Sequence, residues 1–169
     1  MRNKVLISLI VVILVGMAFY YLLGGFSEIE MRVVAVEDIH LIGYEYRGTP
    51  QDENLEKTFQ KIEDLLAAHP ENRLNTIYYV EPAGKLDTMT VFVGTEYNEK
   101  MAGDLEEKII TSSQAIVASL RSHRFVMPGP DRVKRKIEEY ARENGLETQG
   151  IYIDRIVGDD HVDVLAPLK

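Results

Sequence analysis

Apolar and polar positions divide the chain into one long apolar run followed by many short alternating segments. The run from Val5 to Leu23, VLISLIVVILVGMAFYYLL, contains no charged residue. Because about 20 apolar residues in a helix suffice to cross a bilayer, it predicts an uncleaved transmembrane anchor within residues 1–25. A cleaved signal peptide is the alternative, although its apolar core usually ends at small residues and this one ends at Phe19, Tyr20 and Tyr21.

The charges that flank this run predict its orientation. Arg2 and Lys4 precede it, whereas Glu28 and Glu30 follow it. Since positive charges are retained on the cytoplasmic side, we expect a single-pass protein of the cytoplasmic membrane. The rest of the chain would lie on the extracytoplasmic side, and the lipid bilayer would be the partner of residues 5–23.

After the apolar run, the periodicity changes to that of strands and helices. Residues 29–46 are rich in β-branched and aromatic side chains, which predicts a strand with a break near Glu37-Asp38. Apolar residues at helical spacing follow up to Pro70, which ends that helix. Alternating strands are expected over 76–81 and 88–97. The helix positions are Leu55, Phe59, Ile62 and Leu66.

A second set of the same elements follows a charged connector over residues 98–111. A strand is expected over 114–121 and a helix over 131–144, ended by Gly145 at a position that needs positive φ. Strands over 150–155 and 161–166 complete the set. Each half of the chain therefore reads as β-α-β-β.

The two halves also align in sequence, which indicates a duplication. Lys61-Ile62-Glu63-Asp64 matches Lys136-Ile137-Glu138-Glu139, and Leu41-Ile42-Gly43 matches Ile116-Val117-Ala118, both at a shift of about 75. Ile77-Tyr78 matches Ile151-Tyr152 at about 74. The predicted fold class is α+β, in which two β-α-β-β units form an antiparallel sheet with two helices on one face, preceded by one transmembrane helix. The units would cover about residues 29–97 and 113–168 of a domain spanning 26–169.

Composition removes several classes of function. The chain has no cysteine, which excludes disulfides and thiol chemistry, and its net charge of −8 repels phosphate backbones, so no nucleic acid partner is expected. The four histidines are scattered, and there is no Gly-rich phosphate loop, nucleophile elbow or HExxH helix. Neither a metal nor a cofactor is therefore predicted.

Tyrosines and two carboxylates are the candidate ligand-binding residues. Tyrosines on strands can wall a flat apolar site and offer ring faces to a cation, although tyrosine also simply suits half-buried strands. A carboxylate facing an apolar groove would have a raised pKa and could pair with a cation or act as an acid or base, unless it lies on an outer face. The predicted site residues are Tyr44, Tyr46, Tyr78, Tyr152, Asp163 and Glu96.

Two pairs of strings carry a resemblance to a known family. IYYVEPAG with VFVGTEY closes the first half, and GIYID with HVDVLAPL closes the second. In this order they resemble the GyrI-like small-molecule-binding family, which includes the effector-binding domains of AraC-type and MerR-type regulators, over about residues 31–169. The resemblance implies a groove between the halves that takes amphipathic or cationic organic molecules, and some members hydrolyse reactive small molecules.

The resemblance can be carried over at three positions. Tyr152 matches the aromatic residue of the family's Glu-x-aromatic string, and Asp163 matches the acidic residue shortly before the closing Pro167. Gly150 stands where the family often has a groove glutamate, so a cationic ligand would lose one counter-charge there.

Three functions are consistent with these observations. The first is a membrane-anchored, non-enzymatic domain that binds small amphipathic or cationic ligands in the groove. The second is a small-molecule hydrolase or isomerase that uses a groove carboxylate, with Asp163 as the candidate, and a tyrosine. The third is a module that binds a partner protein of the cell envelope.

Overall fold

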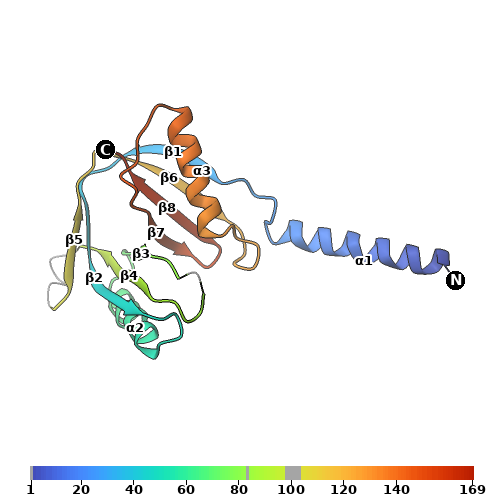
Figure 1. Cartoon of the computed structure of the whole chain (residues 1–169), viewed down its shortest axis with the longest axis horizontal. Coiled ribbons are helices and arrows are strands. Elements are labelled where there is room, and N and C mark those ends of the chain that lie inside the picture. The colour runs from blue at the N-terminus through green and yellow to red at the C-terminus, as the bar shows by residue number, and fades with distance from the viewer. Residues whose placement is uncertain (1, 83, 98–103) are drawn as a thin grey trace.

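The computed structural model describes residues 2–82, 84–97 and 104–169, apart from the side chains of residues 2–5 and 8. In these ranges the chain forms three helices and one antiparallel sheet of eight strands (Figure 1). The helices are α1 (Arg2–Leu22), α2 (Glu53–Ala68) and α3 (Pro130–Glu143). The strands are β1 (Glu30–Ala35), β2 (Ile39–Gly48), β3 (Leu74–Val80), β4 (Met89–Glu96), β5 (Glu106–Ile110), β6 (Gln114–Arg121), β7 (Ile153–Gly158) and β8 (His161–Pro167).

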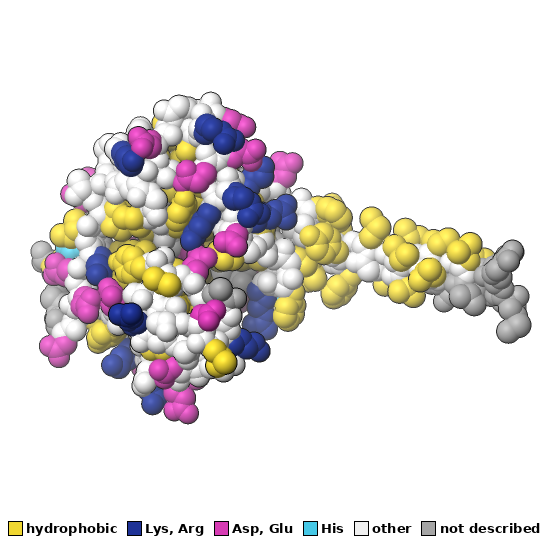
Figure 2. Space-filling model, viewed as in Figure 1, with side chains coloured by type: hydrophobic (Ala, Val, Ile, Leu, Met, Phe, Trp, Pro, Cys, Tyr) yellow, Lys and Arg dark blue, Asp and Glu magenta, His cyan; other side chains and the backbone are white. Residues whose placement is uncertain are grey.

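The predicted membrane span is the main correction. Helix α1 projects away from the sheet, and the apolar side chains described along it are exposed (Figures 1 and 2). Among the described residues, however, no helix is both long and apolar enough to cross a membrane.

This finding overturns two predictions. The fold class is wrong in its transmembrane helix over Val5 to Leu23, and the location at the cytoplasmic membrane with an extracytoplasmic domain is wrong with it. The bilayer likewise has no support as the partner of residues 5–23.

The strand order shows how the two β-α-β-β sets join. It is β1-β6-β8-β7-β3-β4-β2-β5, so β3 of the first set pairs with β7 of the second at the centre of the sheet. The predicted break near Glu37-Asp38 is confirmed, because β1 ends at Ala35 and β2 begins at Ile39. Strand β5 lies inside the segment that was expected only to connect the two sets.

Both helices of the sets pack on the same face of the sheet. Ile62 of α2 is buried with Val91 and Val93 of β4, and Ile137 of α3 is buried with Ile116 and other residues of β6 and β8. One row of cross-strand partners connects the two clusters, because Leu74 lies opposite Ile156 and Ile156 lies opposite Val162. Partners in register share a face of a sheet, so α2 and α3 cover one face side by side. We call this the helix face.

The other face of the sheet is curved around its own apolar cluster. Only residues 36–38 connect β1 to β2, and four steps of extended chain reach about 14 Å, whereas six strand spacings in a flat sheet would span about 29 Å. The sheet must therefore curl so that its two ends approach each other. We call this inner side the concave face. Its buried residues include Leu41, Phe92, Val117 and Leu165.

Two glycines allow the strands to approach closely where the sheet curls. Gly43 of β2 lies opposite Gly94 of β4. A Cβ atom on Gly43 would stand 2.1 Å from the Val93 carbonyl oxygen, and one on Gly94 would stand 2.3 Å from the Ile42 carbonyl oxygen. Backbone oxygens cannot yield as flexible side chains can, so this pair of positions requires glycine.

Candidate functional site: a cleft between the two helices

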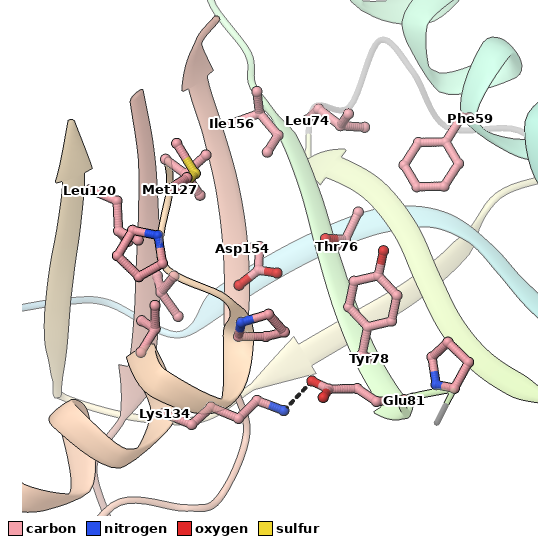
Figure 3. A pocket seen from close by; sticks show the side chains of 16 residues that line it. Phe59, Leu74, Thr76, Tyr78, Glu81, Leu120, Met127, Lys134, Asp154 and Ile156 are labelled. Atoms are coloured by element: carbon pink, nitrogen blue, oxygen red, sulfur yellow. Dashed lines mark hydrogen bonds and ion pairs between the residues drawn. The ribbon is translucent and has the colours of Figure 1, made fainter. Parts of the chain in front are cut away.

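A cleft of about 540 Å³ opens on the helix face between α2 and α3 (Figure 3). Its floor consists of two rows of cross-strand partners from the central strands. One row is Thr76, Asp154 and Val164, and the other is Leu74, Ile156 and Val162. Because successive side chains of a strand alternate between faces, every second residue of β3 and β7 points into the cleft.

The walls of the cleft are mostly apolar. Phe59 of α2 stands on one side, and Met127 and Val133 stand on the other, where α3 begins at Pro130. Proline suits the first position of a helix, since it fixes φ and lacks the amide hydrogen that would go unpaired there. The segment Pro128-Gly129-Pro130 thus sets the start of α3 at the edge of the cleft.

Asp154 places a carboxylate in the middle of this apolar floor. Among the described residues its side chain has no hydrogen-bond partner and no ion pair. Burial raises the pKa of Asp154 from 3.8 to about 6; Lys134 opposes this rise, and the negative charge of Glu81 adds to it. The carboxylate is therefore ionised near neutral pH, although its surroundings disfavour the charge.

An ion pair links the two sides of the cleft beside Asp154. Lys134 of α3 donates a hydrogen bond to Glu81, which follows β3 (Figure 3). Its ammonium also lies 5.1 Å from the centre of the Tyr152 ring. The charges of Lys134 and Glu81 cancel, so Asp154 gives the lining of the cleft a net negative charge.

Tyr78 is the one predicted site residue that lines the cleft. Its ring stands beside Thr76 and Asp154 in Figure 3. Burial raises the pKa of Tyr78, and the charges of Asp154 and Glu81 raise it further, so its hydroxyl stays protonated near neutral pH.

The other three predicted tyrosines are engaged elsewhere on the helix face. Tyr44 packs in the cluster below α2, with the Lys61 ammonium 4.9 Å from its ring centre. Tyr46 is buried and donates a hydrogen bond to the Thr49 carbonyl at 3.1 Å. Tyr152 packs against the α3 cluster and donates to Glu138.

Tyr152 also shows how strongly its surroundings hold its proton. Burial and the hydrogen bond to Glu138 raise the pKa of Tyr152 to about 12. A phenol held in this way keeps its proton near neutral pH, so it can donate a hydrogen bond but cannot act as a base there.

The two predicted carboxylates, Glu96 and Asp163, lie on the concave face. Glu96 pairs with the Arg155 Nε at 3.2 Å, and Asp163 accepts a hydrogen bond from Ser119 at 2.6 Å. Both line a second cavity, which also includes Arg32 and Arg155. The structure thus separates these two side chains from Tyr78 by the thickness of the sheet.

Sequence reasoning missed Asp154, although a signal for it was present. Tyr152 was singled out on a predicted strand, and side chains two residues apart on a strand share a face. Asp154 is therefore the acidic residue that faces the same side as Tyr152, whereas Asp163 alternates with Val162 and Val164 and faces the other side.

No protein-family model and no curated protein matches this chain in sequence, but its fold has solved counterparts. A hydrolase from Listeria innocua superposes with a TM-score of 0.58 at 8% identity, covering 83% of this chain and 92% of that one. The EcmrR C-terminal domain gives 0.54 at 10% identity, covering 83% and 98%. SAV2435, solved with bound tetraphenylphosphonium, gives 0.51 at 14% identity, covering 83% and 94%. These likenesses support a GyrI-like fold for this chain.

Proposed function

We propose that this protein binds small lipophilic cations in the cleft between α2 and α3, with Asp154 as the counter-charge. The observation that carries the proposal is the Asp154 carboxylate, which lacks a protein partner among the described residues and stands on an apolar floor. A burial penalty of this kind is relieved when a cation enters and pairs with the charge.

The shape and the lining of the cleft favour an organic cation over a metal ion. Apolar side chains from both helices would cover the ligand's hydrocarbon groups, while one carboxylate fixes the position of its charge. Tyr78, predicted from the sequence as a ligand residue, would offer its ring to the same charge. Among the described residues no group of three or more histidine or acidic side chains could hold a metal.

One of the solved structures with this fold contains a ligand of the proposed chemical class. SAV2435 was solved with tetraphenylphosphonium, which is itself a lipophilic cation. That ligand belongs to SAV2435 and serves here only as a probe of suitable size and charge.

A pair of probes with matched shape tests the proposal. Tetraphenylphosphonium and tetraphenylborate carry four phenyl rings each and opposite charges. Titrated into the full chain by calorimetry near neutral pH, the cation should bind saturably and the borate should bind at least about tenfold more weakly. Equal affinities for the two ions, or no saturable binding of the cation, would contradict the proposal.

Hydrolysis of a reactive small molecule is a second candidate, favoured by one observation. A carboxyl group with a pKa of about 6 exchanges its proton readily near neutral pH, which suits a general acid or base. A hydrolase of this kind would lose about a hundredfold in kcat/KM on Asp154→Asn in an assay with activated esters and epoxides. Turnover that the substitution leaves unchanged would remove this candidate.

A further inference from the structure

The concave face carries a second cavity of about 540 Å³, separate from the cleft. Its floor is apolar, because Leu41, Val117 and Leu165 belong to the buried cluster of that face. The linker over residues 36–38 borders one side. We propose that this cavity is a binding site for a compact zwitterion of the α-amino acid type that has an apolar side chain.

Two charged side chains that line the cavity are aligned but not paired with each other. Arg155 of β7 lies opposite Asp163 of β8 in the register, and opposite partners on one face have Cβ atoms about 5 Å apart. Arg155 instead directs its Nε to Glu96 and to Asn75, each at 3.2 Å. A positive and a negative group therefore stand side by side with a gap between them.

Both residues line the cavity, and each keeps unused hydrogen-bonding capacity. The two terminal nitrogens of Arg155 have no partner among the described residues, and they form a fork that matches a carboxylate. For Asp163, Oδ1 is fully occupied, because Ser119 donates to it at 2.6 Å and His161 contacts it at 3.1 Å. Oδ2 has only a long contact of 3.7 Å with Arg32 and can accept from an ammonium group.

The position of Asp163 is fixed independently of any ligand. Ser119 is almost fully buried, and its hydroxyl accepts a hydrogen bond from Arg32 at 2.8 Å while it donates to Asp163. Asn75, also fully buried, holds Arg155 in the same way. A pair of charges held by buried partners is preorganised for a ligand, which lowers the cost of binding.

The charges of the cavity favour a ligand that carries both signs. The carboxylates Glu37, Asp38, Glu96 and Asp163 outnumber the cations Arg32 and Arg155 in its lining, which disfavours a simple anion. A ligand with only a positive charge would meet Arg32 and would leave the terminal nitrogens of Arg155 unpaired. An α-amino acid carries its ammonium and carboxylate on one carbon, which matches the adjacent positions of Asp163 and Arg155. Its side chain would reach the floor at Leu41, Val117 and Leu165.

Calorimetric titration of the full chain with three related probes tests this inference. L-Leucine is the zwitterion, isocaproate lacks its ammonium, and isoamylamine lacks its carboxylate. We expect saturable binding of leucine, and about tenfold or greater losses for both single-charge probes. No saturable binding of leucine, or equal binding of isocaproate or isoamylamine, would overturn the proposal.

Two variants and one mapping experiment place the site. Arg155→Gln should weaken leucine about tenfold, whereas Asp154→Asn, on the helix face, should leave leucine unchanged. Because Arg155→Gln could disturb the fold, methyl NMR of the wild-type protein provides a second readout. Leucine should shift the methyl signals of Leu41, Val117 and Leu165 and leave those of Val133 unchanged; the reverse pattern would overturn the proposal.

Discussion

The two faces of the sheet each hold a carboxylate in a cavity, and the two carboxylates have opposite surroundings. Asp154 on the helix face has apolar neighbours and no hydrogen-bond partner among the described residues, and burial raises its pKa to about 6. Asp163, on the adjacent strand and the concave face, is held by Ser119, His161 and Arg32. The comparison teaches that the number of fixed partners, more than the residue type, decides what a carboxylate can bind.

The first prediction tests the backbone on which the concave face depends. Gly43→Ala should lower the free energy of unfolding by about 3 kcal/mol, because the new methyl group would collide with backbone atoms of β4. Urea denaturation followed by circular dichroism measures it. Gly158→Ala is the matched control, since its Cβ would meet no atom within 4 Å, and it should change stability by less than about 0.5 kcal/mol. Equal losses of stability in the two variants would contradict the close approach of β2 and β4 at Gly43.

The second prediction concerns the pH dependence that Asp154 confers. Its folded-state pKa, about 6, is raised above the value of 3.8 for an exposed group. The folded state therefore holds this proton more tightly, and the resulting stabilisation is complete below pH 3.8 and disappears as the pH rises through about 6.

Asp154→Asn removes this titration. After allowance for partial solvent screening, we expect the variant to be about 2 kcal/mol more stable than the wild type above neutral pH, with the gap closing towards acid pH. Thermal and urea unfolding across the pH range provide the measurement. If the stability of the variant changed with pH as that of the wild type does, burial of the Asp154 carboxylate would not be what destabilises the folded state above neutral pH.

The third prediction compares the polar groups of the two faces. Ser119→Ala should cost about 1.5 kcal/mol, because Asp163 and Arg32 both lose a buried partner. Thr76→Val on the helix face is the control, since the Thr76 hydroxyl has no hydrogen-bond partner among the described residues, and it should cost less than about 0.5 kcal/mol. Chemical denaturation measures both, and a greater cost for Thr76→Val would reverse the comparison.

The fourth and smallest prediction examines the ion pair beside the cleft. Lys134→Met removes the cation that opposes the raised pKa of Asp154 and leaves Glu81 unpaired. The affinity for tetraphenylphosphonium near neutral pH should rise about threefold. Lys136→Met is the control, because Lys136 pairs with Glu139 on the same helix at 2.7 Å, and it should leave the affinity unchanged. A fall in affinity for Lys134→Met would show that the ion pair supports binding.

Much of the architecture within the sheet could be predicted because strands and helices leave different periodicities in the sequence. The break between β1 and β2 and the positive φ of Gly145, which is 66°, follow from local chemistry alone. The curling of the sheet could not be predicted, since it depends on which strands become neighbours. The length of the uncharged apolar run also predicted a membrane span over Val5 to Leu23, which is not found among the described residues.

The repeat alignment shows where sequence reasoning failed in detail. At a shift of about 75, Ile62 and Ile137 correspond correctly, since both are fully buried on their helices. The same shift pairs Leu41 with Ile116, yet Leu41 faces the concave side and Ile116 faces α3. An error of one residue in a strand moves a side chain to the opposite face of the sheet. The face on which Asp163 or Glu96 lies therefore follows from the alternation of side chains within its own strand, and the repeat alignment does not give it.

The pH dependence of tetraphenylphosphonium binding tests the central claim most directly. If Asp154 supplies the counter-charge, the wild-type affinity should fall about tenfold between about pH 7.5 and about pH 5, because the carboxyl group takes up a proton across that range. Asp154→Asn should bind weakly at both values, and Asp163→Asn should retain the wild-type profile. A wild-type affinity that does not change with pH, or an unchanged affinity in Asp154→Asn, would contradict the account.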